Sequence, residues 1–131
     1  MATTVGVVRE RVPGERRVAL TPDVAKKLKG KGADLLMEAG AGITASFPDA
    51  AYKDVVTADA ASVLSRSDVL LKVQPPSLEE ISGLREGTVL ISYLSPHLAP
   101  ERTKALRDRK ITSFAMELLP RTTRAQAMDV L

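Results

Sequence analysis

Short apolar blocks alternate along the chain with segments of helical periodicity. Five apolar blocks predict strands, at residues 5–8, 35–37, 69–73, 89–94 and 111–116. Four segments with helical spacing alternate with them and begin at Thr21, Ser77, Pro100 and Arg124. Strands that are apolar throughout are buried on both faces, so the pattern predicts a three-layer α/β domain. The sheet should be mostly parallel and flavodoxin-like or Rossmann-like.

Local signals place two of the helix ends. Thr21 is a good N-cap, and Pro22 follows it at the first helical position, so a helix should begin there and stop at Gly30 or Gly32. Residues 77–80 have the Ser-x-x-Glu spacing of a capping box. The segment 124–131 is also expected to be helical, and it ends without a C-cap glycine. We therefore interpret residues 1–131 as a single N-terminal domain that continues in a longer protein.

Composition and charge exclude several classes of function. The chain has no cysteine and one histidine, His97, so thiolate and histidine-rich metal sites are excluded, and no metal site is expected. The net charge of +3 arises from basic residues interspersed with acidic ones, which is typical of a solvated surface. With four aromatic residues, stacking on nucleic acid is not expected. No apolar run approaches the roughly 20 residues of a membrane helix, so a cytoplasmic location is expected.

A glycine-rich segment after the second predicted strand matches a dinucleotide-binding pattern. Residues 40–45 read Gly-Ala-Gly-Ile-Thr-Ala, in the G-x-G-x-x-A spacing. In that fingerprint the glycines open a helix whose amides face a pyrophosphate. Pro48 comes too early inside such a helix, and no acid ends a clear strand about 20 residues further on. We interpret the segment as a tight glycine turn.

Three stretches together resemble the alanine dehydrogenase and NAD(P) transhydrogenase family, and they cover essentially the whole chain. They are Arg9-Glu10 with Gly14-Glu15-Arg16-Arg17-Val18-Ala19-Leu20-Thr21-Pro22, then Leu71-Lys72-Val73-Gln74-Pro75-Pro76, and then Ala115-Met116-Glu117-Leu118-Leu119-Pro120-Arg121 with Arg124-Ala125-Gln126-Ala127-Met128-Asp129. The resemblance is to the N-terminal domain of this family. It implies that the NAD-binding Rossmann domain that would follow is absent from residues 1–131.

The resemblance also separates the two branches of the family. It places Arg17 where the alanine dehydrogenase branch has a substrate-binding arginine. That branch has a lysine where this chain has Gln74, and a histidine where it has Ser95. Lysine and histidine bind or protonate a keto acid, and glutamine and serine cannot replace that chemistry. The nearby His97 is two positions from the required place, so the resemblance favours the transhydrogenase branch.

The third stretch resembles a transhydrogenase loop that lies beside the nicotinamide. Carried over residue by residue, its arginine, glutamine and aspartate fall on Arg121, Gln126 and Asp129, which are the expected catalytic residues. The spacing agrees, because Gln126 and Asp129 are three apart and share one face of a helix. The cofactor-binding residues expected from this loop are Arg121, Thr122, Thr123, Arg124 and Gln126.

The resemblance implies a function that the chain would perform only in a larger assembly. It implies hydride transfer from NADH to NADP+, coupled to proton translocation, with NAD(H) bound by the component to which this chain belongs. One partner component would bind NADP(H) and another would conduct protons across the membrane. The full-length form is expected to be a homodimer that is peripheral to the inner membrane through its partners. The 131-residue chain alone is expected to be catalytically silent.

Other interpretations remain open from the sequence. The chain could be the N-terminal domain of an alanine dehydrogenase-like amino-acid dehydrogenase, or a stand-alone binding module without catalytic activity. Arg16 and Arg17 could be a surface pair that precedes a helix. Lys72 could take part in a site, or could be a strand-end charge or an internal partner of an acid such as Glu10.

Overall fold

The structure is a computed structural model, and it describes residues 2–94 and 100–118. Within these residues the strands are β1 (Thr4–Val7), β2 (Asp34–Glu38), β3 (Val56–Ala58), β4 (Val69–Leu71), β5 (Val89–Ser92) and β6 (Thr112–Ala115). The helices are α1 (Pro22–Gly30), α2 (Ala60–Arg66), α3 (Leu78–Gly83) and α4 (Pro100–Asp108). Short 3-10 turns are η1 (Ile43–Ala45), η2 (Asp49–Ala51) and η3 (Met116–Leu118).

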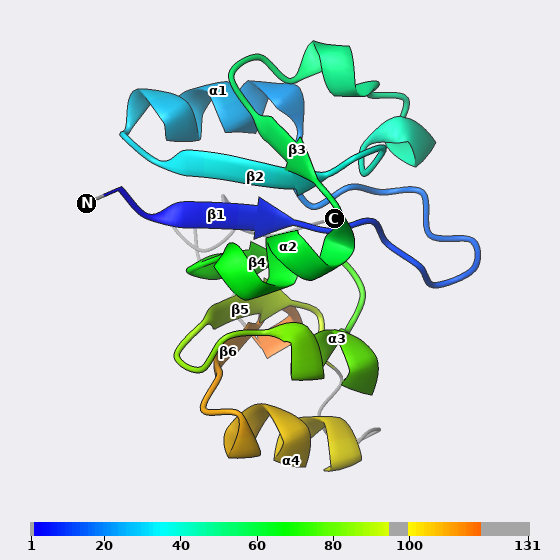
Figure 1. The fold of residues 1–131 in the computed structure, drawn as a ribbon. Coiled ribbons are helices and arrows are strands. Elements are labelled where there is room, and N and C mark those ends of the chain that lie inside the picture. The colour runs from blue at the N-terminus through cyan, green and yellow to red at the C-terminus, as the bar shows by residue number, and fades with distance from the viewer. Residues whose placement is uncertain (1, 95–99, 119–131) are drawn as a thin grey trace.

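The strands form one six-stranded sheet in the order β3-β2-β1-β4-β5-β6, and each neighbouring pair is parallel. This is the Rossmann-type order, so the predicted α/β fold with a mostly parallel sheet is confirmed. The chain reverses its direction of travel across the sheet between β1 and β4. Figure 1 shows α1 beside β2, whereas α2, α3 and α4 follow one another along the other half of the sheet.

Alternate residues of the strands supply two separate hydrophobic cores, as the period of a strand requires. On β2, Leu36 packs into the core that α2, α3 and α4 cover. Its neighbours Leu35 and Met37 pack into the other core, on the side of α1. Gly6 on β1 leaves room for the end of α2, because a Cβ at this position would lie 1.7 Å from Oγ of Ser67.

The predicted helix starts are confirmed, but the strand prediction was incomplete. Oγ1 of Thr21 accepts a hydrogen bond at the start of α1, and both halves of the capping box are present at α3. The predicted strands 69–73 and 89–94 end earlier, at Leu71 and Ser92. Strand β3 and helix α2 were missed. β3 has three residues at the sheet edge and is largely exposed, so it lacks the apolar block on which the prediction relied.

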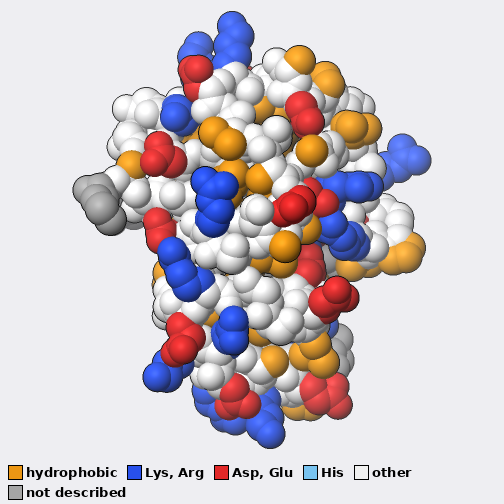
Figure 2. Space-filling model, viewed as in Figure 1, with side chains coloured by type: hydrophobic (Ala, Val, Ile, Leu, Met, Phe, Trp, Pro, Cys, Tyr) orange, Lys and Arg blue, Asp and Glu red, His pale blue; other side chains and the backbone are white. Residues whose placement is uncertain are grey.

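The surface agrees with the mixed charge pattern of the sequence. Figure 2 shows acidic and basic side chains interspersed over the viewed face, without a large field of one sign. Two exposed pairs are Arg85 with Asp68 and Lys110 with Glu86. No helix within residues 2–94 and 100–118 combines the length and the apolar character that a membrane span requires.

Candidate functional site

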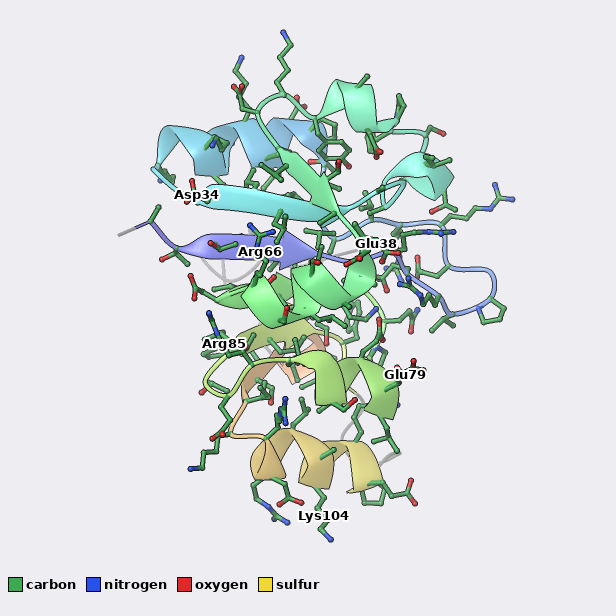
Figure 3. All side chains as sticks on the ribbon, viewed as in Figure 1. Asp34, Glu38, Arg66, Glu79, Arg85 and Lys104 are labelled. Atoms are coloured by element: carbon green, nitrogen blue, oxygen red, sulfur yellow. The ribbon has the colours of Figure 1, made fainter. Side chains whose placement is uncertain are left out.

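Polar side chains gather at the edge of the sheet where the parallel strands have their carboxyl ends. Figure 3 shows Glu38 and Glu79 at this edge, and Asp34 and Arg85 at the opposite one. In sheets with this order, ligands bind in the crevice outside the carboxyl ends of the strands, where the strand order reverses. Here that point lies between β1 and β4. The segments that follow these two strands therefore form the candidate site.

Lys72 follows β4 and lies between two carboxylates. Its Nζ is 3.4 Å from Oε1 of Glu10, which follows β1, and 3.4 Å from Oε2 of Glu80 on α3. The side chains of Lys72 and Glu10 are each 2% exposed. The backbone N–H groups of Val73 and Gln74 also donate to Glu10, at 2.9 and 3.0 Å. The interpretation of Lys72 as an internal partner of Glu10 is confirmed, and the group fixes β1, β4 and α3 to one another.

A second polar group lies beside the first and surrounds Glu15. Arg17 donates from Nε and Nη2 to the two oxygens of the Glu15 carboxylate, at 3.0 and 2.9 Å. The side-chain amide of Gln74 donates to the same carboxylate at 2.7 Å. The hydrogen bonds from Arg17, and then that from Gln74, lower the pKa of Glu15 to about 2. The guanidinium of Arg17 also lies over the ring of Tyr93, 6.0 Å from its centroid.

A third charged contact ties the loop after β1 to the end of β2. Arg11 donates to Glu38 at 2.9 and 2.6 Å, and the N–H of Arg9 adds a bond of 3.0 Å. Burial opposes the ionisation of Glu38, but the hydrogen bonds from Arg11 and Arg9 outweigh it, and the pKa is lowered. Next to Arg11 is a hollow of about 590 Å³ between α2 and α3. Alanines and Leu64 of α2 line one side of it, so its wall is partly apolar.

The chain leaves β6 at the same edge, and Glu117 ties its exit to the end of β5. The carboxylate of Glu117 on η3 accepts the backbone N–H of Leu94, at 2.9 Å to one oxygen and 3.3 Å to the other. The carbonyl of Leu94 accepts a bond of 2.7 Å from Nη1 of Arg102 on α4. The ends of β1, β4, β5 and β6 are thus held together by side chains at one edge.

The glycine segment after β2 forms a tight turn, as predicted. It leads into the 3-10 turn η1 and does not open an α-helix. A Cβ on Gly42 would lie 2.6 Å from the carbonyl oxygen of Phe47 and 2.8 Å from the hydroxyl of Tyr52, so the absent side chain serves internal packing. One reason given for this prediction was wrong, because β3 does supply a strand that is followed by an acid, Asp59. That carboxylate accepts the N–H of Ser62 at 2.8 Å and caps α2.

The structure brings together some of the residues that the sequence singled out, and others lie outside the described residues. Arg17 and Gln74 meet on Glu15. The expected catalytic and cofactor-binding residues all lie outside the residues described, and they are Arg121, Thr122, Thr123, Arg124, Gln126 and Asp129. Ser95 and His97 also lie outside them.

Sequence reasoning missed the roles of Glu15, Tyr93 and Glu117. Glu15 is two residues from Arg17, and the sequence alone does not reveal that their side chains close onto each other. Tyr93 was assigned to the interior of a predicted strand. A signal for Glu117 did exist, because a carboxylate directly after a strand lies at the edge where parallel sheets bind ligands. The site offers hydrogen-bond donors, carboxylates and a ring, which are groups that orient a ligand.

Comparison with known proteins places this geometry in one family. The family described as "Alanine dehydrogenase/PNT, N-terminal domain" matches residues 6–131. The chain is 42% identical to an NAD(P) transhydrogenase subunit alpha protein of Rhodospirillum rubrum, over 97% of this chain and 35% of that protein. It is 38% identical to an alanine dehydrogenase of Halomonas elongata, over 88% of this chain and 32% of that protein. The chain therefore spans about a third of the length of these relatives.

Solved structures give the same result. A transhydrogenase from Sinorhizobium meliloti superimposes with a TM-score of 0.91 and 43% identity, over 96% of this chain and 38% of that one. An L-alanine dehydrogenase superimposes with a TM-score of 0.83 and 30% identity, over 88% of this chain and 32% of that one.

Proposed function

Because the chain belongs to the alanine dehydrogenase/PNT family and matches its N-terminal domain, we propose that it belongs to the NAD(H)-binding component of an NAD(P) transhydrogenase. The full assembly would transfer hydride from NADH to NADP+ and couple this to proton translocation. A partner component would bind NADP(H), and a membrane component would conduct protons. The component containing this chain would be a homodimer at the cytoplasmic side of the inner membrane.

The contact between Gln74 and Glu15 is the observation that supports this branch of the family. In an alanine dehydrogenase site, the resemblance requires a lysine at position 74 to meet the keto acid. Here the residue is a glutamine, and its amide donates to Glu15 at 2.7 Å. The fork of Arg17, which would otherwise meet a substrate carboxylate, faces the same Glu15. The charges at this point are satisfied within the chain, which favours a cofactor-orienting role over amino-acid binding.

The roles of the individual residues belong to the same proposal. Gln126 and Arg121 would fix the nicotinamide end of NAD(H), with Thr122, Thr123 and Arg124 beside them, and Asp129 would orient these groups or meet the partner component. A glutamine amide has both a donor and an acceptor for a carboxamide. Direct hydride transfer depends on the placement of two nicotinamides, so these residues would act by orientation.

The described residues fit one end of a dinucleotide better than the whole. Within residues 2–94 and 100–118, the glycine turn is filled by Phe47 and Tyr52 and does not open a helix toward a pyrophosphate. The adenosine and pyrophosphate would therefore be held by a Rossmann unit that residues 1–131 do not include. We expect the isolated chain to bind NADH weakly and to be catalytically silent.

The test is a titration of the 131-residue chain with NADH, followed by NMR at the backbone amides of residues 121–129. Chemical shift changes confined to this loop are expected, and Gln126→Asn and Asp129→Asn should diminish them. Lys104→Gln, on the exposed side of α4, is the matched control and should leave them intact. If millimolar NADH shifts no amide in this loop, either here or in a longer chain that includes the next domain, the assignment is wrong.

The alternative function is an alanine dehydrogenase, which the 38% identical relative keeps in view. It predicts alanine-dependent reduction of NAD+ by the full-length protein. The transhydrogenase proposal predicts no such reaction, because Gln74 cannot supply the charge of a lysine. A measured alanine-dependent rate would reverse the choice between the two branches.

A further inference from the structure

The end of β5 is held by a side chain at the point where strand pairing stops. The last residue pair between β5 and β6 is Ser92 with Ala115. The next peptide on β5 joins Tyr93 to Leu94, and its N–H donates to the carboxylate of Glu117 at 2.9 Å. A backbone N–H bound to a charged acceptor is held more strongly than in an ordinary strand pair. Glu117 thus takes the place of the strand partner that this peptide lacks.

The peptide held by Glu117 also sets the place of an aromatic ring in the candidate site. Tyr93 lies below the guanidinium of Arg17, 6.0 Å from it, and Arg17 binds Glu15. On its other side, the backbone N–H of Tyr93 donates to the carbonyl of Val73 on the neighbouring segment, at 3.1 Å. The Tyr93 ring is therefore positioned from the backbone, and one of the groups that fixes this backbone is Glu117.

We propose that Glu117 is a positioning residue, which holds the Tyr93–Leu94 peptide and so keeps the Tyr93 ring against Arg17. This clamp couples the exit of β6 to the polar group around Glu15. Its importance for cofactor binding rests on the proposed function, since the residues expected to meet the nicotinamide follow Glu117 along the chain. The clamp itself is measurable without any ligand.

The chain carries its own internal reference for this test, because it has two tyrosines. Tyr52 is 6% exposed, lies in the core on the side of α1, and donates its hydroxyl to the carbonyl of Leu20 at 2.7 Å. With 13C-labelled tyrosine, NMR reports the two rings separately. Glu117→Ala should shift the ring signals of Tyr93 and leave those of Tyr52 in place. Equal shifts at both tyrosines, or none at Tyr93, would overturn the proposal.

Two further variants separate positioning from a general effect of charge or stability. Glu117→Gln keeps one side-chain acceptor for the N–H of Leu94, so Tyr93 should return close to its original signals. Glu86→Ala removes an exposed carboxylate that pairs with Lys110 near the start of β6, and it should move neither tyrosine. If Glu117→Ala does not fold, hydrogen exchange of the Leu94 amide in the original chain decides. A protected amide supports the clamp, and an amide that exchanges freely refutes it.

The ligand experiment distinguishes a failure of the clamp from a failure of the proposed function. Glu117→Ala should weaken NADH binding about fivefold, the equivalent of one net hydrogen bond. Unchanged affinity in a variant whose Tyr93 has moved would show that the clamp does not serve the site, which overturns its proposed role. If the original chain and the longer chain both fail to bind NADH, the proposed function fails, while the comparison of Tyr93 with Tyr52 still decides the clamp.

Discussion

Replacement of Lys72 by methionine is the most direct test of the charged group at the carboxyl edge. Lys72→Met keeps the length of the side chain and removes the charge that lies 3.4 Å from both Glu10 and Glu80. Removing one partner of a buried ion pair costs about 3–5 kcal/mol, because the other charge stays buried without compensation. Glu10 is 2% exposed but keeps two backbone N–H donors, and Glu80 is 13% exposed. We therefore expect the lower end of this range, about 3 kcal/mol.

The free energy of unfolding is measured by urea denaturation with far-UV circular dichroism, where the midpoint and slope are fitted together. Lys104→Met, on the exposed side of α4, is the matched control and should stay within about 0.5 kcal/mol of the original chain. The double variant Lys72→Met/Glu10→Gln should recover some of the loss, since it also removes the buried negative charge. A loss below about 1 kcal/mol for Lys72→Met would refute the reasoning, because it would mean that the buried carboxylates do not depend on this cation.

Two further predictions follow from the geometry. The pKa of Glu15 is lowered to about 2, so its stabilising contribution is complete above the ordinary value of 4.5 and is lost as the pH falls toward 2. Since the arginine partner is half-exposed, we expect about 1–2 kcal/mol, and Glu15→Gln should flatten the pH dependence of the urea midpoint between pH 5 and about 2. Gly6→Ala should cost about 2–3 kcal/mol, because the new Cβ meets Oγ of Ser67, whereas Gly30→Ala, with nothing within 4 Å, should be close to neutral in the same assay.

The sequence predicted those elements whose local chemistry matches their final environment. The start of α1 follows from Thr21 and Pro22, and the start of α3 from Ser77 and Glu80, because the capping bonds lie within four residues of each other. The central strands were found because both of their faces are buried. The edge strand β3 escaped notice because its three residues are largely exposed, so no apolar block marks them.

The candidate site was predicted less completely than the fold, for a physical reason. The partnership of Lys72 with Glu10 joins residues 62 apart, and that of Gln74 with Glu15 joins residues 59 apart. Such contacts depend on which strands become neighbours, and a periodic pattern does not reveal the strand order. The acid Glu10 could be named because carboxyl ends of parallel strands converge, but the choice of Glu15 as the partner of Gln74 depends on how the loop after β1 folds back.

The distribution of charge at the carboxyl edge supports a division of labour in cofactor binding. A pyrophosphate needs cations or helix N-termini that are directed at it. Among the described residues, Lys72 faces Glu10 and Glu80, Arg17 faces Glu15, and Arg11 faces Glu38, so these cations are already directed at carboxylates of the chain itself. A nicotinamide ring with its carboxamide asks instead for oriented hydrogen-bonding groups and close packing. The edge is better suited to that end of NAD(H), and a partner domain would have to supply the groups that bind the phosphates.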